Sequence, residues 1–255
     1  MQDIKSIGSS VIGDEDMRLF MHTLMSGAGG LGMELSDDEV KTFASMYQEL
    51  MKFNESINLT SIIKPEEFAI KHILDSLLCS RILHEMGSGQ VVDVGTGAGF
   101  PGLPLAIHYP CLHFTLVESV GKKADYVRYI SDLLGLENVQ VIQARAEELG
   151  RQDSHREKYD VAMARGVAML SILVEYCLPL VRVGGIFIAM KGPGAQEEIA
   201  NASRALGETG GEIEKVDEIT LPLGQVLRRL VVIRKQRPCP VRYPRRPGIP
   251  AKKPL

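Results

Sequence analysis

The chain has 255 residues, of which 24% are charged and 45% are apolar. This composition fits one or two globular domains and excludes collagen, a coiled coil and wholesale disorder. The net charge of −3 argues by itself against a nucleic-acid partner. However, residues 1–218 carry 19 Lys and Arg against 32 Asp and Glu, whereas residues 219–255 carry 10 Lys and Arg and no acid. This basic segment needs an explanation that the total charge does not give.

The cysteines and the apolar runs indicate the compartment. No two of the four cysteines form a C-x-x-C pair, which argues against a zinc knuckle and a redox dithiol. No run approaches 18 apolar residues, and the first 17 residues lack the apolar run of a secretory signal. We therefore expect a reduced, cytoplasmic protein with no metal site and no membrane contact. No protein partner is evident from the sequence, and we expect a monomer.

Both ends of the chain differ from its middle. Residues 1–35 are rich in glycine and weakly patterned, which predicts a flexible arm with at most a short helix near residues 17–24. Residues 238–255 hold six of the 13 prolines and five of the basic residues. We expect this basic, Pro-rich tail to be extended rather than helical.

A small helical region is predicted over residues 36–89. Ser36 and Glu39 have the spacing of a capping box, in which each side chain binds the other residue's backbone N–H at the start of a helix. Apolar residues then follow at helical spacing. Pro65, followed by two glutamates, begins a second helix because proline and acids suit the first turn.

From residue 90 to residue 237 the pattern is that of an α/β domain. Short runs rich in Val and Ile alternate with amphipathic stretches, which predicts a parallel sheet covered by helices on both faces. The expected strands span residues 91–94, 113–118, 139–144, 161–164, 186–190, 212–221 and 229–234. The expected helices span residues 102–108, 122–134 and 169–180. Too little chain separates the last two strands for a crossover helix, so they should pair antiparallel.

A glycine-rich loop between the first strand and the next helix is the strongest motif. It reads Asp93-Val94-Gly95-Thr96-Gly97-Ala98-Gly99-Phe100-Pro101-Gly102. Glycines let the chain turn sharply and let a ligand approach the backbone. The spacing of Gly97, Gly99 and Gly102 matches the dinucleotide fingerprint, which leaves an NAD-dependent oxidoreductase as an alternative. The D-x-G-x-G-x-G pattern instead resembles the first motif of class I S-adenosylmethionine-dependent methyltransferases.

Asp93 helps to separate these two ligand classes. A dinucleotide brings a pyrophosphate, which is repelled by a nearby anion. S-adenosylmethionine has an ammonium and a sulfonium group but no phosphate, so an acid at Asp93 suits it. The alternative is that Asp93 caps a helix or a turn.

Two further acids follow the next strands. Glu118 ends the second strand, where an acid binds the ribose hydroxyls in both ligand classes. Ala146 and Glu147 follow the third strand, where residues of methyltransferases approach the adenine. Glu147 then accepts from the adenine amino group, or it is only a first-turn acid of a short helix. Phe100 covers the cofactor or packs into the sheet.

Over residues 36–250 the chain resembles the bacterial small-subunit ribosomal RNA methyltransferase G family, also called glucose-inhibited division protein B. The motifs that carry the resemblance, besides the glycine loop, are Phe53-Asn54, Ile57-Asn58-Leu59-Thr60-Ser61, Lys71-His72-Ile73-Leu74-Asp75-Ser76, Ala164-Arg165-Gly166-Val167-Ala168, Met190-Lys191-Gly192 and Tyr243-Pro244-Arg245-Arg246-Pro247-Gly248.

The resemblance implies a Rossmann-like class I methyltransferase sheet with S-adenosylmethionine as cofactor. The implied reaction methylates N7 of a guanine in the 530 loop (helix 18) of 16S ribosomal RNA, as free RNA or in the small ribosomal subunit. The positions that match the family's cofactor-contacting residues are Gly95, Phe100, Ala146, Glu147 and Arg165.

The chemistry of guanine N7 agrees with the sequence. This atom carries a lone pair and no proton, so methylation needs no general base but only correct placement. Arg165 and Lys191 follow the fourth and fifth strands at the edge where open α/β sheets bind ligands. We predict that both act as catalytic residues by orienting the guanine. The alternative is that both are exposed cations at strand ends.

The remaining substrate candidates are less distinct. His72 and Asp75 lie three residues apart on one predicted helix and share a face. They bind substrate, or they form a polar cap between the helical region and the sheet, which we favour for His72. Asn58 closes over the site or caps a turn.

The basic tail offers the last candidates. Tyr243 either stacks on an RNA base or packs on the domain, and Arg245 and Arg246 are expected to bind RNA phosphates. A non-catalytic RNA-binding protein with a relic fold is a third hypothesis, against which the intact glycines argue.

Overall fold

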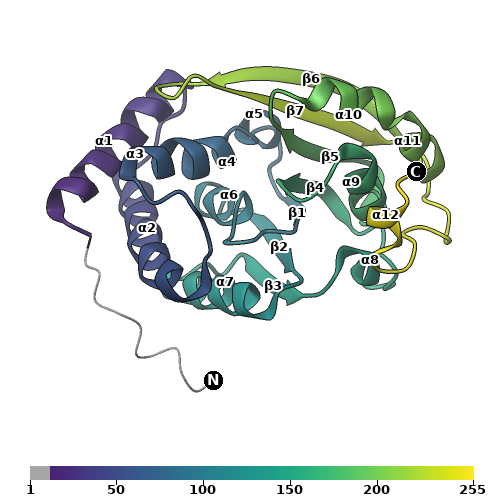
Figure 1. Ribbon diagram of the computed structural model, residues 1–255, viewed down its shortest axis with the longest axis horizontal. Helices are drawn as coiled ribbons and strands as arrows, with labels where there is room; N and C mark the ends of the chain where they lie inside the picture. Colours follow the sequence, from purple (N-terminus) through teal and green to yellow (C-terminus); the bar gives the residue numbers. More distant parts are fainter. Residues whose placement is uncertain (1–11) are drawn as a thin grey trace.

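Within residues 12–255, seven strands form one mixed sheet in the order β3-β2-β1-β4-β5-β7-β6 (Figure 1). The computed structural model describes residues 12–255. The strands are β1 Gly89–Val94, β2 Leu112–Glu118, β3 Val139–Gln143, β4 Tyr159–Arg165, β5 Val181–Lys191, β6 Gly211–Leu221 and β7 Val226–Lys235. Strands β1 to β5 are parallel, whereas β7 runs antiparallel to both β5 and β6. The predicted parallel sheet with an antiparallel pair is confirmed.

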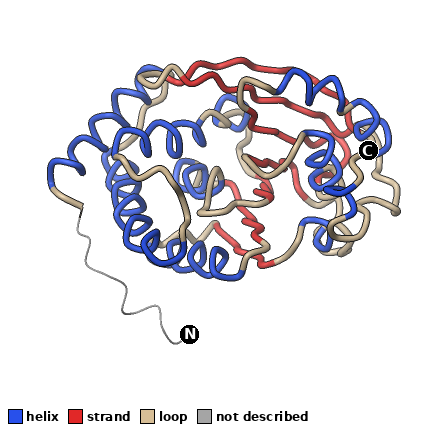
Figure 2. Tube along the Cα trace, viewed as in Figure 1, coloured by secondary structure: helices blue, strands red, loops and turns tan. Residues whose placement is uncertain are grey.

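The helices fall into two groups along the chain (Figure 2). Those before the sheet are α1 Asp14–Gly30, α2 Asp37–Ile57, α3 Pro65–Phe68, the π-helix η1 Ala69–Leu74, α4 Asp75–Leu77 and α5 Ser80–Leu83. Those that follow β1 are α6 Gly102–His108, α7 Gly121–Leu133, α8 Ala146–Leu149, α9 Leu170–Cys177, α10 Ala195–Asn201, α11 Ser203–Thr209 and α12 Ile249–Lys252. Within residues 12–255, no helix combines the length and the apolar character needed to cross a membrane.

Each face of the sheet has its own core. Side chains alternate along a strand, so Val91 packs in one cluster and Val92 in the other. Helices α1 to α7 contribute to the first cluster, and α8, α9 and α11 contribute to the second. Figure 1 shows the purple to teal helices on one side of the sheet and the green helices on the other. The sheet therefore separates two layers of helices, as its sequence pattern predicts.

The predicted start of α2 is confirmed. The Ser36 hydroxyl accepts a hydrogen bond from the Glu39 N–H at 3.3 Å, and Glu39 Oε2 accepts from the Ser36 N–H at 2.7 Å. Asn58 ends the helix with φ 48° and ψ 62°, in the left-handed region that asparagine tolerates. Asn58 thus occupies the C-cap position of α2, as the turn-capping alternative predicts, and it is exposed.

The expected flexible arm over residues 1–35 is wrong for residues 14–30. They form α1, whose Phe20 and Leu24 are fully buried. The Phe20 ring stacks on Tyr47 of α2 with 5.0 Å between ring centroids. A Cβ at Gly27 would lie 2.2 Å from Leu74 Cδ1, so this glycine allows close helix packing rather than a loop. Residues 1–11 lie outside the described residues.

The sequence also gave no indication of α10 and α11. Their buried residues are Ala195 in α10 and Ala205, Leu206 and Thr209 in α11, with Ala202 buried between the two helices, and these mostly small side chains give a weak hydrophobic periodicity. The expected extended tail is partly wrong, because residues 249–252 form the short helix α12.

Candidate active site

The carboxyl ends of β1 and β4 mark the point where the strand order reverses, which is where open α/β sheets bind ligands. The glycine loop leaves β1 here, and the N–H groups of Gly95 and Thr96 donate to the Val117 carbonyl at 2.8 and 3.0 Å. A cavity of about 220 Å³ opens beside the loop. Its lining residues are Val94, Gly95, Val117, Ser119, Ala144, Arg145, Ala146, Glu147, Val167, Ala168, Tyr176 and Ala251.

Two glycines of the loop have different functions. Gly97 has φ 61°, and a Cβ there would meet nothing within 4 Å, so its backbone borders open space. Gly99 has φ 97°, and a Cβ there would lie 2.2 Å from Leu103 Cδ1. Gly97 therefore leaves room for a ligand, whereas Gly99 allows the loop to pack on α6.

Asp93 lies beneath the loop and is fully buried. Its Oδ2 accepts a hydrogen bond from the Gly102 N–H at 2.9 Å, at the start of α6. Its Oδ1 has no hydrogen-bond partner among the described residues. Burial raises the pKa of Asp93 to about 6, although the Thr96 side chain and the Gly102 N–H oppose the shift. Asp93 thus takes the helix-capping role that the sequence offered as the alternative, and its charge lies below the loop.

Glu118 positions the glycine loop. Its Oε2 accepts from the Gly97 N–H at 2.9 Å, and its Oε1 accepts from the Val120 N–H at 2.8 Å. Oε1 also accepts from the Ser119 hydroxyl at 3.4 Å, whereas Oε2 can accept one more hydrogen bond. Glu118 can therefore hold the loop and still accept from a ribose hydroxyl through Oε2.

Ala146, Glu147 and Tyr176 line the cavity on the side of β3. Glu147 is 3% exposed, and its Oε1 accepts from the Gly248 N–H at 2.9 Å. Burial and the neighbouring Glu147 carboxylate raise the pKa of Tyr176 to about 12, so its hydroxyl remains a donor. Tyr176 was not singled out in the sequence, because it belongs to an otherwise apolar helical segment.

Arg165, at the end of β4, joins the sheet to the helical region. Its Nη1 donates to the Lys71 carbonyl at 3.0 Å and to Asp75 Oδ2 at 2.8 Å, and its Nη2 lies 3.2 Å from His72 Nδ1. Lys71 and His72 belong to the π-helix η1, and Asp75 begins α4. The sequence predicts a regular helix here, whereas the wider π turn is typical of functional sites. The structure thus brings together Arg165, His72 and Asp75.

The tautomer of His72 follows from its neighbours. Because the Arg165 guanidinium is only a donor, Nδ1 must be the accepting nitrogen, and Nε2 then donates to Thr60 Oγ1 at 2.8 Å. Burial, together with the positive charges of Arg165 and Lys71, lowers the pKa of His72 to about 3. His72 is therefore a neutral link between the helical region and the sheet, which is the structural role favoured from the sequence.

Phe100 is 4% exposed and packs within this cluster. The His72 ring stacks on it with 4.4 Å between centroids and 9° between planes. The Arg165 guanidinium carbon lies 5.3 Å from the centroid of the Phe100 ring, a cation–π geometry. Phe100 therefore packs between the glycine loop, His72 and Arg165.

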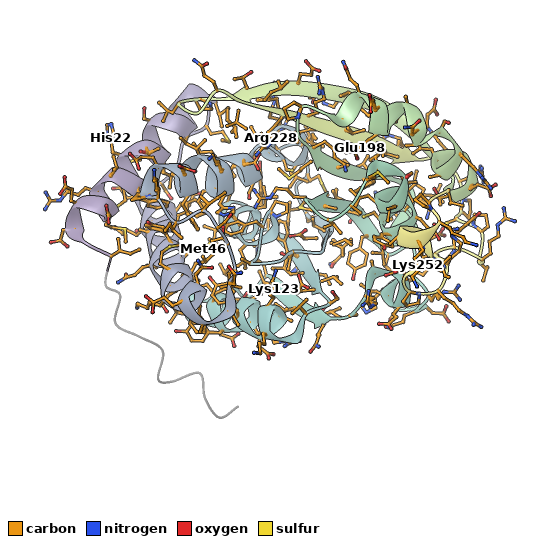
Figure 3. All side chains as sticks on the ribbon, viewed as in Figure 1. His22, Met46, Lys123, Glu198, Arg228 and Lys252 are labelled. Atoms are coloured by element: carbon orange, nitrogen blue, oxygen red, sulfur yellow. The ribbon has the colours of Figure 1, made fainter. Side chains whose placement is uncertain are left out.

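Arg228 was missed from the sequence. It lies on β7, near α4 in Figure 3, and its Nε donates to Asp75 Oδ1 at 2.7 Å. Asp75 is 1% exposed and therefore holds two guanidinium groups, those of Arg165 and Arg228. Two positive charges against one negative charge leave this cluster cationic. Asp75 and Arg228 are 153 residues apart, and no local pattern predicts such a pair.

Lys191 differs from its predicted catalytic role. Its Nζ donates to Glu198 Oε2 and to the Ala168 carbonyl, each at 2.6 Å. Glu198, labelled in Figure 3, also accepts from the Leu170 N–H at 2.8 Å. Lys191 therefore fixes the loop after β4 that lines the cavity. The alternative of exposed strand-end cations is also wrong, since the side chains of Arg165 and Lys191 are 17% and 9% exposed.

The cations of residues 219–255 are mostly paired with acids of the body. Six of the ten form ion pairs, namely Arg228–Asp75, Arg229–Glu218, Arg234–Glu214, Lys235–Glu157, Arg242–Glu208 and Arg245–Glu175. The basic charge of this segment therefore largely neutralises the protein's own acids, and less of it faces RNA than the sequence implies.

The predicted RNA contacts of the tail need two corrections. Tyr243 is 6% exposed and its hydroxyl donates to Glu208 Oε2 at 3.1 Å, so it packs on the domain instead of presenting its ring to a base. Arg245 makes a two-fold contact with the fully buried Glu175, so it is a structural cation. Arg246 is exposed, as an RNA contact requires.

The sheet order, the glycine loop and the cavity beside it define the class I fold of S-adenosylmethionine-dependent methyltransferases. A solved structure of this fold is that of Pyrococcus horikoshii TYW2 in complex with MeSAdo, which is 15% identical with a TM-score of 0.51 over 64% of this chain and 62% of that chain. At this identity the likeness shows the fold alone.

Residues 39–226 match the family described as rRNA small subunit methyltransferase G. The chain is 45% identical over 232 residues to the Ribosomal RNA small subunit methyltransferase G of Alkaliphilus metalliredigens, covering 91% of this chain and 97% of the relative. It is 47% identical over 232 residues to the protein of the same name from Deinococcus radiodurans, covering 91% of each. The chain belongs to the rRNA small subunit methyltransferase G family, a family of S-adenosylmethionine-dependent methyltransferases.

The two loop glycines give a matched pair of variants. Gly97→Ala should lower the free energy of unfolding by about 1 kcal/mol, because alanine disfavours the positive φ at this position. It should weaken the binding of S-adenosylmethionine about tenfold or more, because the new methyl group enters the open space beside the loop. Gly99→Ala should instead lower the free energy of unfolding by roughly 2–4 kcal/mol, since its Cβ also meets Leu103. Calorimetric titration and denaturant unfolding measure the two effects. If both variants lost cofactor affinity and stability to the same extent, the assignment of Gly97 to ligand binding and of Gly99 to packing would be contradicted.

Proposed function

We propose that the protein transfers a methyl group from S-adenosylmethionine to N7 of a guanine in the 530 loop (helix 18) of 16S ribosomal RNA. The observation that carries this proposal is the cationic cluster of Arg165 and Arg228 around Asp75, which adjoins the glycine loop through the contact of Arg165 with Phe100. The family match over residues 39–226 supports ribosomal RNA as the substrate.

The cofactor fits the residues around the cavity. The open space at Gly97 and the free accepting capacity of Glu118 suit the amino acid and ribose parts of S-adenosylmethionine. Ala146 and Glu147, farther along the sheet edge, suit its adenine. Asp93 adds negative charge below the loop, which favours a cationic ligand over a dinucleotide pyrophosphate.

The residues near Arg165 suit a reaction without proton transfer. Bound S-adenosylmethionine supplies an electrophilic methyl group, and guanine N7 has a lone pair and no proton to lose. His72 remains neutral because its pKa is about 3, so it does not compete as a base near pH 7. A guanidinium has five N–H donors, and Arg165 uses three in contacts with Lys71, Asp75 and His72. The others are available to orient the guanine through O6.

The site of methylation is the direct test. Purified protein is incubated with a tritiated methyl donor and, in parallel, with free 16S RNA or with small subunits from cells that lack this gene. We expect 7-methylguanosine in the 530 loop, detected by mass spectrometry of RNase fragments and by strand cleavage after borohydride and aniline treatment. A methyl group on another base, or outside this loop, would contradict the proposal.

The two other hypotheses predict different results. An NAD-dependent oxidoreductase would bind NAD and not S-adenosylmethionine in calorimetric titrations, and the family match argues against it. A non-catalytic RNA-binding protein would bind small subunits without labelling them, even when the wild-type protein binds the cofactor. The same preparations therefore separate all three.

The exposed cations near the cavity should contribute to RNA affinity. Replacing Arg246, Lys252 and Lys253 with alanine should reduce the slope of log affinity against log salt by roughly 2, because three phosphate contacts are lost. Arg234→Ala is the matched control, because Arg234 already pairs with Glu214. Filter binding at several salt concentrations measures both slopes, and equal slopes for the triple variant and wild type would remove these residues from the interface.

A further inference from the structure

Residues 238–248 are fastened to the body by arginines from the loop after α8. Arg156 donates to the carbonyls of Cys239 and Tyr243 at 2.7 and 2.8 Å. Arg151 Nε donates to the Pro244 carbonyl at 2.9 Å. Backbone groups of the basic segment therefore have fixed partners, and the segment follows a defined path over the protein.

A buried ion pair fixes the next part of this path. Arg245 Nε and Nη2 contact the two carboxylate oxygens of Glu175 at 2.9 and 2.6 Å, and the Arg245 N–H donates to Glu175 Oε1 at 2.7 Å. Glu175 lies on α9 and is fully buried, so its charge requires this partner. The pair holds the segment against α9.

The segment then reaches the cavity. Gly248, with φ 81°, turns the chain into α12, and its N–H donates to Glu147 Oε1 at 2.9 Å. Three residues later Ala251 lines the same cavity as Ala146 and Glu147. Figure 1 shows α12 beside α8 and α9. Lys252, labelled in Figure 3, directly follows Ala251 in the sequence.

The strand order indicates which part of the ligand lies there. Gly97 follows β1, Glu118 ends β2, and Ala146 follows β3, and these strands are neighbours in the sheet. A ligand whose amino acid end lies at the loop after β1 and whose ribose lies at Glu118 extends its base toward β3. For such a ligand, Ala251 lies on the side of the cavity that receives the adenine.

We propose that residues 245–251 complete the cofactor site, with Ala251 as a wall over the adenine and the Gly248 N–H orienting Glu147 toward the adenine amino group. This inference rests on the proposed use of S-adenosylmethionine. It assigns the basic segment a part in cofactor binding and base specificity, separate from any contact with RNA.

A pair of tryptophan variants tests the wall, because the chain has no tryptophan of its own. Ala251→Trp should change its fluorescence when S-adenosylhomocysteine is added, whereas Val241→Trp, at a position 85% exposed in the same segment, should not. Removal of residues 248–255 should weaken the binding of S-adenosylmethionine about tenfold. It should also reduce the preference for 5′-methylthioadenosine over 5′-methylthioinosine, which a general loss of stability would not do. Thermal unfolding of each variant checks the fold.

The outcomes separate the inference from the proposed function. If the wild-type protein does not bind S-adenosylmethionine, the proposed function is wrong. The second outcome is that the wild type binds S-adenosylmethionine, the shortened chain has the same affinity and base preference, and the fluorescence of Ala251→Trp does not change. In that case the proposed role of residues 245–251 in the cofactor site is wrong, while the proposed function stands. A truncated chain that fails to fold leaves the two tryptophan variants to decide.

Discussion

Arg165→Ala should lower methyl transfer by about 100-fold or more while the protein remains folded. Arg165 is the cation at the end of β4, and it is held by Asp75, His72 and the Lys71 carbonyl in a fixed orientation. Its loss should remove the donor that we propose orients the guanine. Asp75 keeps Arg228 as a partner, so we expect a stability loss of only about 1–3 kcal/mol. Single-turnover labelling of small subunits, with denaturant unfolding in parallel, measures the two effects.

Two matched variants sharpen this test. Arg234→Ala removes the same charge from an exposed ion pair with Glu214 and should leave turnover unchanged. Arg165→Lys keeps the charge but loses the planar fork, so it should retain the fold and recover only a small part of the rate. A titration with S-adenosylmethionine shows whether the loss lies in cofactor affinity or in the methyl-transfer step. Near-normal turnover of Arg165→Ala would remove this residue from the site.

Asp93→Asn should make the protein more stable at pH 8 than the wild type, by roughly 3 kcal/mol at most. Burial raises the pKa of Asp93 from 3.8 to about 6. Below pH 3.8 the folded and unfolded states both hold the proton. Between pH 3.8 and 6 only the folded state holds it, so the free energy of unfolding falls as the pH rises, and above pH 6 the full cost is present. The asparagine Oδ1 can still accept from the Gly102 N–H.

Asp160 provides a control with the opposite sign. Its pKa is lowered by hydrogen bonds from the Gln90 N–H and Arg182, despite an opposing effect of burial. Asp160 therefore stabilises the protein above its unfolded pKa and loses this effect as the pH falls, so Asp160→Asn should be most harmful near pH 7. Urea unfolding of the three proteins from pH 4 to pH 8 measures the differences. Parallel pH profiles for Asp93→Asn and wild type would contradict the raised pKa.

The sheet and the glycine loop were predictable because their signals are local. Val and Ile runs at β1 to β5 and the spacing from Asp93 to Gly102 are properties of adjacent residues. The packed helix α1 was not predictable, because its glycines, such as Gly27, also occur in loops. At Gly27 the absence of a side chain allows close contact with Leu74, and this contact is visible only in the tertiary structure.

The candidate site was predictable only in part for the same reason. Arg165, His72 and Asp75 belong to short motifs, and the structure brings them together. Arg228 and Ala251 reach the site from strands and segments distant in sequence, so composition and periodicity do not distinguish them from other residues nearby. Lys191 had the right position at a strand end, but its partner Glu198 turns it into a support for the loop after β4.

The ion pairs of residues 219–255 also bear on how the protein meets RNA. Six of these cations are neutralised by acids of the body, and within residues 12–255 no acid forms an ion pair with Arg246, Lys252 or Lys253. Of the four cations in this segment that form no ion pair with a described residue, Arg237 lies before Pro238, whereas Arg246, Lys252 and Lys253 lie within five residues of Ala251, which lines the cavity. A polyanion should therefore be attracted more strongly to these three residues than to the ion-paired part of the segment. For the rRNA substrate that we propose, we expect this long-range field to favour orientations that bring the cavity toward the RNA before contact, and we expect salt to weaken this effect.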